Sequence, residues 1–195
     1  MTRSATIDRK TNETDIHLRI VLDGTGEGKR ESGIGFLDHM LDLFAKHAAV
    51  DLDVSAKGDL HVDDHHTAED IGIALGQAID KALGNRAGIC RYGHFTLPMD
   101  ECLVTSAIDL GGRYAFEYQA PIATPKIGAF DSELIEHFWQ SFASNARANL
   151  HVVLHNGKNG HHIAEAVFKA TARAIRMAAS ADPRSTGVPS TKGVL

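Results

Sequence analysis

The sequence has few cysteines, no long apolar run and no excess of positive charge, and each shortage excludes a class of protein. Only Cys90 and Cys102 are present, both beside apolar residues, so we expect two buried free thiols in a reducing cytosol, not a disulfide framework. No apolar run reaches the length of a membrane span, and the first residues lack the apolar core of a secretory signal. A net charge of −5 argues against a broad nucleic-acid surface.

These exclusions leave a cytoplasmic globular chain that binds neither membrane nor nucleic acid. Its 195 residues are 43% hydrophobic, which is enough to bury a substantial core in one domain. The unusual number is twelve histidines. Ordinary composition does not account for so many, so their positions carry the functional argument.

A repeat becomes visible around the histidines. Three features recur in the same order at a nearly constant offset: a histidine motif followed by an amphipathic segment, a short apolar strand, and a helix start that carries two adjacent histidines. Their first copies are Phe36–Met40, Val50–Val54 and Asp64–Glu69, and their second copies are Leu134–Phe138, Leu150–Leu154 and Gly160–Glu165. Such a recurrence indicates an internal duplication.

The local periodicity agrees with this duplication. Alternating apolar residues at 16, 18, 20 and 22, and again at 114, 116 and 118, predict one strand in each half. After Glu69, apolar residues recur on one helical face until Gly84, a residue type that commonly ends a helix. We therefore expect an α/β (α+β) fold of two β-β-α-β-α halves, about 1–88 and 89–195, fused into one domain.

The spacing of the paired histidines and the glutamates that follow them suits metal binding. His65 and Glu69 lie four residues apart, so one helical face presents both to one ion, and His161 and Glu165 repeat this spacing. The adjacent His66 and His162 point about 100° around the helix, where they can reach a second ion instead. The repeat then predicts two sites, whose ligands are His39, His65, Glu69 and His162 in one, and His137, His161, Glu165 and His66 in the other.

Nitrogen and carboxylate ligands without thiolate favour manganese, iron or zinc over a structural zinc finger. Four protein ligands would fill a tetrahedral zinc site, whereas an octahedral ion such as Mn²⁺ keeps positions open for substrate, so catalysis favours manganese. The motif alone leaves two rivals open: a dimetal hydrolase, such as a phosphatase or deaminase, and a metal-storage or metal-sensing protein. The HExxH pattern of zinc proteases is absent.

The sequence resembles the imidazoleglycerol-phosphate dehydratase family over nearly its whole length. The matching motifs are RKTNET at 9–14, GFLDHML at 35–41, DHHTAED at 64–70, RYG at 91–93, PMDE at 98–101, DLGGR at 109–113, HHIAEAVFK at 161–169 and PSTKG at 189–193. The resemblance implies a lyase of histidine biosynthesis, which converts imidazole glycerol phosphate to imidazole acetol phosphate and water. It also implies two mixed four-stranded sheets enclosing a helical layer, two Mn²⁺ per active site, and a homo-oligomer of 24 subunits built from trimers.

The resemblance also assigns site residues. Glu13 is expected to act as an acid/base near the imidazole, and five ligand residues share the catalytic role: His39, His65, Glu69, His161 and Glu165. The phosphate is expected to bind Arg91, Arg113, Ser190 and Lys192.

Other interpretations of single residues stay open at this point. Arg91 and Arg113 fit surface ion pairs as well as a phosphate site, and Lys192 fits a frayed tail. Asp100 could orient a group or simply begin a strand. The glycine-rich stretch 24–28 matches a phosphate loop only weakly and is expected to form a mobile turn or flap.

Overall fold

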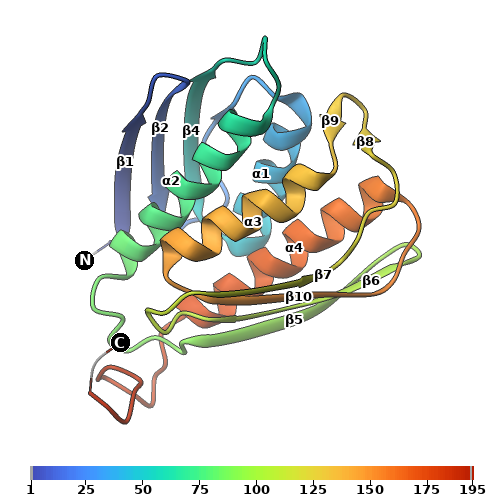
Figure 1. Ribbon diagram of the computed structural model, residues 1–195. Helices are drawn as coiled ribbons and strands as arrows, with labels where there is room; N and C mark the ends of the chain where they lie inside the picture. Colours follow the sequence, from blue (N-terminus) through green and yellow to red (C-terminus); the bar gives the residue numbers. More distant parts are fainter. Residues whose placement is uncertain (1, 194) are drawn as a thin grey trace.

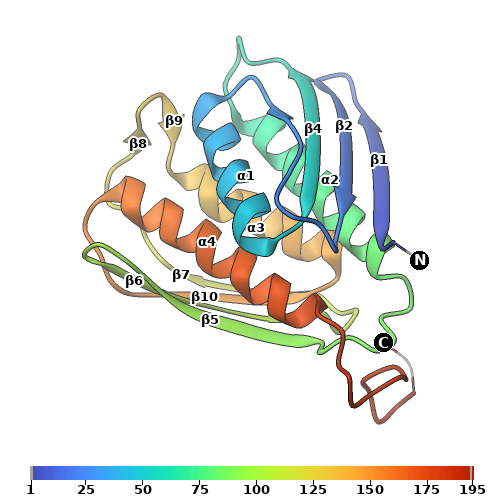
Figure 2. The ribbon, with the colours of Figure 1, turned by 180° about the vertical axis from the view of Figure 1, so that it is seen from behind.

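The computed structural model describes residues 2–193 and 195, which form two four-stranded sheets with four helices between them and one small hairpin (Figures 1 and 2). The elements of the first half are β1 (Ser4–Lys10), β2 (Thr14–Val21), β3 (Arg30–Glu31), α1 (Gly35–Ala48), β4 (Asp51–Gly58) and α2 (His65–Leu83). Those of the second half are β5 (Tyr92–Met99), β6 (Cys102–Asp109), β7 (Ala115–Gln119), β8 (Lys126–Ile127), β9 (Phe130–Asp131), α3 (Glu133–Ala146), β10 (Asn149–Asn156) and α4 (Gly160–Ala179).

The two large sheets have the same topology, which confirms the predicted duplication, although each half adds a third strand, β3 or β7, before its first helix. The strand orders are β1-β2-β4-β3 and β5-β6-β10-β7, so β1, β2, β3 and β4 correspond to β5, β6, β7 and β10. In each sheet three strands are antiparallel and the last pairs in parallel, as the pairs β3–β4 and β7–β10 show. The small β8–β9 hairpin lies outside this symmetry and was not predicted from the sequence.

The helices pack across the repeat rather than within it. Helix α2 covers the first sheet and α4 covers the second, while α3 lies along α2 and α1 lies along α4. The contact between α2 and α3 is close because Gly72 and Gly76 face the α3 backbone. A Cβ atom at Gly76 would lie 2.5 Å from the carbonyl oxygen of Phe142, a separation that van der Waals repulsion forbids.

The core fills the space between the two sheets. Its aromatic centre is formed by Trp139, Phe138, Phe142 and Phe168, all at most 1% exposed, with Phe44 packed against the tryptophan. One contiguous apolar cluster includes residues of both halves, so the halves share a core. No helix in the described part of the chain is long and apolar enough to cross a membrane.

Two local expectations need correction. Cys102 is buried, but Cys90 is only half-buried. The stretch 24–28 is not a free flap, because Asp51 Oδ1 accepts the backbone N–H groups of Thr25 at 2.8 Å and Glu27 at 3.1 Å. Gly28, with φ of +118°, lets the backbone run close beside β4. The loop is therefore fastened to β4.

Candidate metal centres and basic cavity

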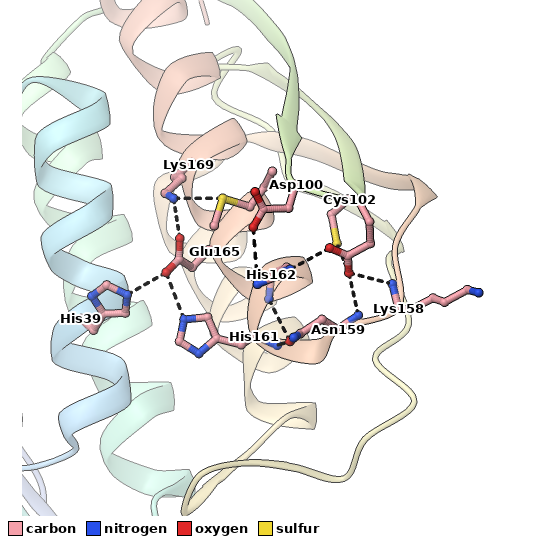
Figure 3. Close-up of polar contacts among 11 residues, drawn as sticks. His39, Asp100, Cys102, Lys158, Asn159, His161, His162, Glu165 and Lys169 are labelled. Atoms are coloured by element: carbon pink, nitrogen blue, oxygen red, sulfur yellow. Dashed lines mark hydrogen bonds and ion pairs between the residues drawn. The ribbon is translucent and has the colours of Figure 1, made fainter.

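The first candidate metal centre joins α1 and α4. His39 Nε2 lies 2.9 Å from Glu165 Oε1, and His161 Nε2 lies 3.0 Å from the same oxygen (Figure 3). Lys169 donates to the other carboxylate oxygen. Burial of Glu165 would raise its pKa, but hydrogen bonds from Lys169, His39 and His161 outweigh it and lower the pKa to about 2. Two imidazoles therefore meet at a carboxylate that stays ionised at neutral pH.

The second candidate metal centre is its counterpart between α2 and α3. It contains His65, Glu69 and His137, whose ligand atoms all lie within 4.8 Å of one another, as they do in the first centre. His137 Nε2 lies 3.2 Å from Glu69 Oε1, yet it is buried and has no hydrogen-bond partner among the described residues. A buried nitrogen without a partner is costly unless a ligand satisfies it. Both donor sets therefore fit a divalent cation that accepts imidazole and carboxylate.

The predicted assignment of His39 and His137 was wrong. His39 belongs with His161 and Glu165, and His137 belongs with His65 and Glu69. The reason is the packing of the helices: α1 lies along α4, and α3 lies along α2. Each centre therefore takes its first histidine from the opposite half of the chain.

The predicted fourth ligands, His66 and His162, do not join either centre within this chain. His66 Nδ1 lies 3.0 Å from Asp59 Oδ2, and His162 Nδ1 lies 2.7 Å from Glu101 Oε2. Both imidazoles are turned about the helix axis away from the neighbouring cluster, as the 100° step between adjacent residues requires. The four-ligand sets expected from the sequence are therefore incomplete within a single chain.

Carboxylates also lie near the other nitrogen of each of these histidines. Glu13 Oε1 is 3.8 Å from His66 Nε2. Figure 3 shows the contact in the other half, where Asp100 Oδ2 is 3.6 Å from His162 Nε2. Glu13 lies in the turn before β2, and Asp100 lies in the corresponding turn before β6. The candidate acid/base Glu13 is thus placed beside a candidate ligand nitrogen.

Sequence reasoning gave no role to Glu101, which contacts His162 directly. Its signal was positional: Glu101 immediately precedes β6, just as Glu13 immediately precedes β2. The pKa of Glu101 is held well below its usual range, mainly by a hydrogen bond from His162 and to a smaller extent by one from the backbone of Asn159. Asn159 in turn caps α4, because its side chain accepts the backbone N–H groups of His161 and His162.

The four predicted phosphate-binding residues line one cavity of about 690 Å³. They are Arg91, Arg113, Ser190 and Lys192. Arg91 is 9% exposed, so a surface ion pair does not describe it. Its guanidinium donates to both carboxylate oxygens of Asp109, at 2.7 and 3.0 Å, and to the carbonyl oxygen of Pro189 at 2.8 Å. Arg91 thereby fastens the segment that carries Ser190 and Lys192.

The basic cavity and the first candidate metal centre lie at opposite ends of the folded molecule. Arg91 donates its backbone N–H to Ala178 near the end of α4, whereas His161 begins that helix. At 1.5 Å per residue, the two places are about 25 Å apart. Figure 1 shows the C-terminal segment at one end of the molecule and the β8–β9 hairpin, beside the first centre, at the other. A small phosphorylated molecule cannot touch both within one chain.

Comparisons of this chain with known proteins identify its family. The family model for imidazoleglycerol-phosphate dehydratase matches residues 32–175. The relative of that name from Rhodopirellula baltica is 77% identical over 99% of this chain and 96% of its own length. The one from Desulforamulus reducens is 53% identical over the full length of both chains.

Solved structures agree with the sequence relatives. The crystal structure of imidazoleglycerol-phosphate dehydratase from Staphylococcus aureus has a TM-score of 0.84 at 36% identity and covers 92% of this chain and 99% of that chain. The Pyrococcus furiosus structure, in complex with (S)-C348, has the same TM-score at 34% identity and covers 97% and 100%. On the family match and these relatives together, the chain belongs to the imidazoleglycerol-phosphate dehydratase family.

Proposed function

We propose that this chain dehydrates imidazole glycerol phosphate to imidazole acetol phosphate at a site that holds two Mn²⁺ ions. Membership of the family makes it a hydro-lyase of histidine biosynthesis. The observation that carries the proposal is the pair of matched centres, each with two imidazoles and one carboxylate at the start of a helix. Family membership disfavours both a hydrolase and a metal-storage protein. A cytoplasmic location, as the sequence predicts, suits amino-acid biosynthesis.

Manganese fits the donor set because all donors are nitrogen or oxygen, and because three ligands per centre leave room for further ones. His66 and His162 are the fourth ligands, supplied to centres of neighbouring subunits. When bound, the ions supply Lewis-acid stabilisation of negative charge on the imidazole ring of the substrate. The first centre would be held by His39, His161 and Glu165, and the second by His65, Glu69 and His137.

The chain's own residues supply proton transfer and phosphate binding. Glu13 moves one of the substrate's protons during the elimination, because its carboxylate lies beside His66 Nε2 and is exposed enough to reach a ligand there. Arg113, Ser190 and Lys192 hold the phosphate at the opposite end, with Arg91 ordering the segment that carries two of them. Phosphate oxygens match guanidinium and ammonium donors.

The active site is shared between subunits. The separation of about 25 Å within one chain supports this, because the metal centres must meet the basic cavity of another copy to hold one small substrate. We propose 24 subunits built from trimers, a closed assembly in which every such junction is satisfied. Ligands from two chains make metal binding and association mutually dependent.

The test combines activity, metal content and particle size in one preparation. Purified protein is assayed with Mn²⁺ and imidazole glycerol phosphate, with the ketone product as readout, and the metal is then removed with a chelator. We expect activity to disappear and light scattering to show small oligomers, while circular dichroism keeps its helical signal; added Mn²⁺ should restore activity and size. Full activity in verified metal-free protein would reject the metal site, and an unchanged particle would reject metal control of assembly.

A further inference from the structure

A carboxylate accepts the Nδ1 hydrogen of the second histidine in each half. Asp59 takes this place beside His66, at 3.0 Å, and Glu101 takes it beside His162, at 2.7 Å. The two acceptors do not correspond in the repeat, because Asp59 follows β4 whereas Glu101 precedes β6. Two different places in the fold therefore supply the same contact to the same nitrogen.

Backbone hydrogen bonds hold both of these residues in place. The second oxygen of Glu101 accepts the N–H of Asn159 at 2.9 Å, and Asn159 caps the helix that carries His162 (Figure 3). The backbone N–H of Asp59 donates to the carbonyl of Glu13, and the backbone carbonyl of Asp59 accepts the N–H of Val62. The side chain of Asp59 is 17% exposed. The Glu101 carboxylate is therefore held by a second contact, and the backbone that carries the Asp59 carboxylate is held on both sides.

An imidazole that donates from Nδ1 is, when neutral, the tautomer whose lone pair lies on Nε2. The ring orientation is fixed at the same time, so Nε2 of His66 and His162 faces outward. Histidine ligands of metals commonly donate their other N–H to a carboxylate, which sets the tautomer and strengthens the ligand. We propose that Asp59 and Glu101 are positioning residues, which present Nε2 of His66 and His162 to metal ions at subunit junctions.

A rival interpretation is a third metal site formed by Glu101, Cys102 and His162, whose potential ligand atoms lie close together. The Cys102 thiol donates to Glu101 Oε1 at 3.4 Å and is 1% exposed, so it keeps its proton and remains closed to solvent. The geometry therefore favours an orienting carboxylate.

This inference rests on the proposed function, since it requires that the chain binds manganese. Its test is a Mn²⁺ titration of the full chain, followed by the electron paramagnetic resonance signal of free Mn²⁺, together with the melting temperature of the metal-free protein. We expect Glu101→Ala and Asp59→Ala each to weaken binding about 10- to 100-fold at the sites affected. Glu101→Gln keeps an acceptor oxygen for the Nδ1 hydrogen and should recover most of the affinity.

Two controls separate positioning from folding. Glu117→Ala removes an exposed carboxylate of β7 that makes no side-chain hydrogen bond within the described residues, and it should bind Mn²⁺ like the wild type. The metal-free melting temperature of Glu101→Ala should stay close to that of the wild type. Equal affinity in Glu101→Ala, Asp59→Ala and the wild type would overturn the proposal, as would a metal-free Glu101→Ala or Asp59→Ala protein that is largely unfolded. Absence of binding in the wild type would instead reject the proposed function.

Discussion

His39 and Glu165 are 126 residues apart in the chain, and their side chains lie 2.9 Å apart across the boundary between the halves. The contact follows from the packing of α1 along α4, which turns the imidazole of His39 toward the buried carboxylate. Because Glu165 also contacts His161, the three side chains form one unit. A change at any of them should therefore affect the same candidate centre.

The grouping of ligands predicts which double variants lose one ion and which lose two. His39→Ala combined with His161→Ala removes two ligands of a single centre, so about one ion per chain should remain. His39→Ala combined with His65→Ala damages both centres, so metal content should approach zero. Elemental analysis of gel-filtered protein measures the difference. If the first pair lost both ions while the second kept one, the grouping would be refuted.

Glu13→Gln should lower turnover at least about 100-fold, because an amide cannot exchange a proton at neutral pH. Metal content should stay at the wild-type value, since Glu13 belongs to neither centre. The matched control is Asp15→Asn, which changes an exposed carboxylate two residues away that pairs only with Lys10 among the described residues. Near wild-type turnover in Glu13→Gln would exclude it as the proton carrier.

Lys192→Ala should raise KM and leave kcat largely unchanged, because a phosphate contact is made in both ground and transition states. Lys192 lines the cavity with Arg113 and Ser190, far from the metal centres. Steady-state kinetics with the phosphorylated substrate gives both constants. Lys158→Ala, at an exposed lysine beside the start of α4, provides a charge-matched control. A fall in kcat alone would contradict a role limited to binding.

Mixed assemblies should regain activity when each subunit carries a different defect. Glu165→Ala damages a candidate metal centre and Lys192→Glu reverses a charge in the basic cavity, so each variant alone should be nearly inactive at substrate concentrations well below its KM. When the two are dissociated, mixed and reassembled with Mn²⁺, some junctions combine an intact centre with an intact cavity. The specific activity of the mixture should exceed that of either variant. No gain, despite proven mixing, would show that each chain builds its site alone.

The loop before β3 should loosen when Asp51 is removed. Backbone hydrogen bonds from Thr25 and, to a smaller extent, Glu27 lower the pKa of Asp51. These bonds therefore stabilise the loop fully at pH values above the usual pKa of a carboxyl group. This stabilisation is lost as the pH falls through the lowered pKa. Asp51→Ala should speed hydrogen exchange at the amides of Thr25 and Glu27. Asp53→Ala should instead affect Lys29, whose N–H Asp53 accepts at 3.1 Å.

Much of the fold was predictable because the repeat and the periodicity are local properties. Alternation at Ile16, Leu18 and Ile20 reflects the inner face of β2, where all three are at most 1% exposed. The predicted end of α2 at Gly84 holds because glycine readily adopts the positive φ of +57° found there. The β8–β9 hairpin escaped prediction because its strands have two residues each and show no periodicity.

Six of the eight predicted ligands meet in two clusters, but their grouping could not be predicted from the sequence. His39 and His137 occupy corresponding positions in the repeat, so their spacing fits either centre equally well. Which one each joins depends on helix packing, and that is decided by contacts between elements distant in the chain. Glu101 was missed for a similar reason, since only the folded turn before β6 brings it to His162.

The exchange of His39 and His137 between the halves has an evolutionary consequence. A half-length ancestor that carried one such histidine and one HHxxE helix would have left its own cluster incomplete. Two copies related by a two-fold axis would each complete the other, because an isologous contact exchanges the same residues in both directions. Fusion of two such copies would keep the reciprocal arrangement in one chain, and it would free the two candidate centres to diverge independently of symmetry.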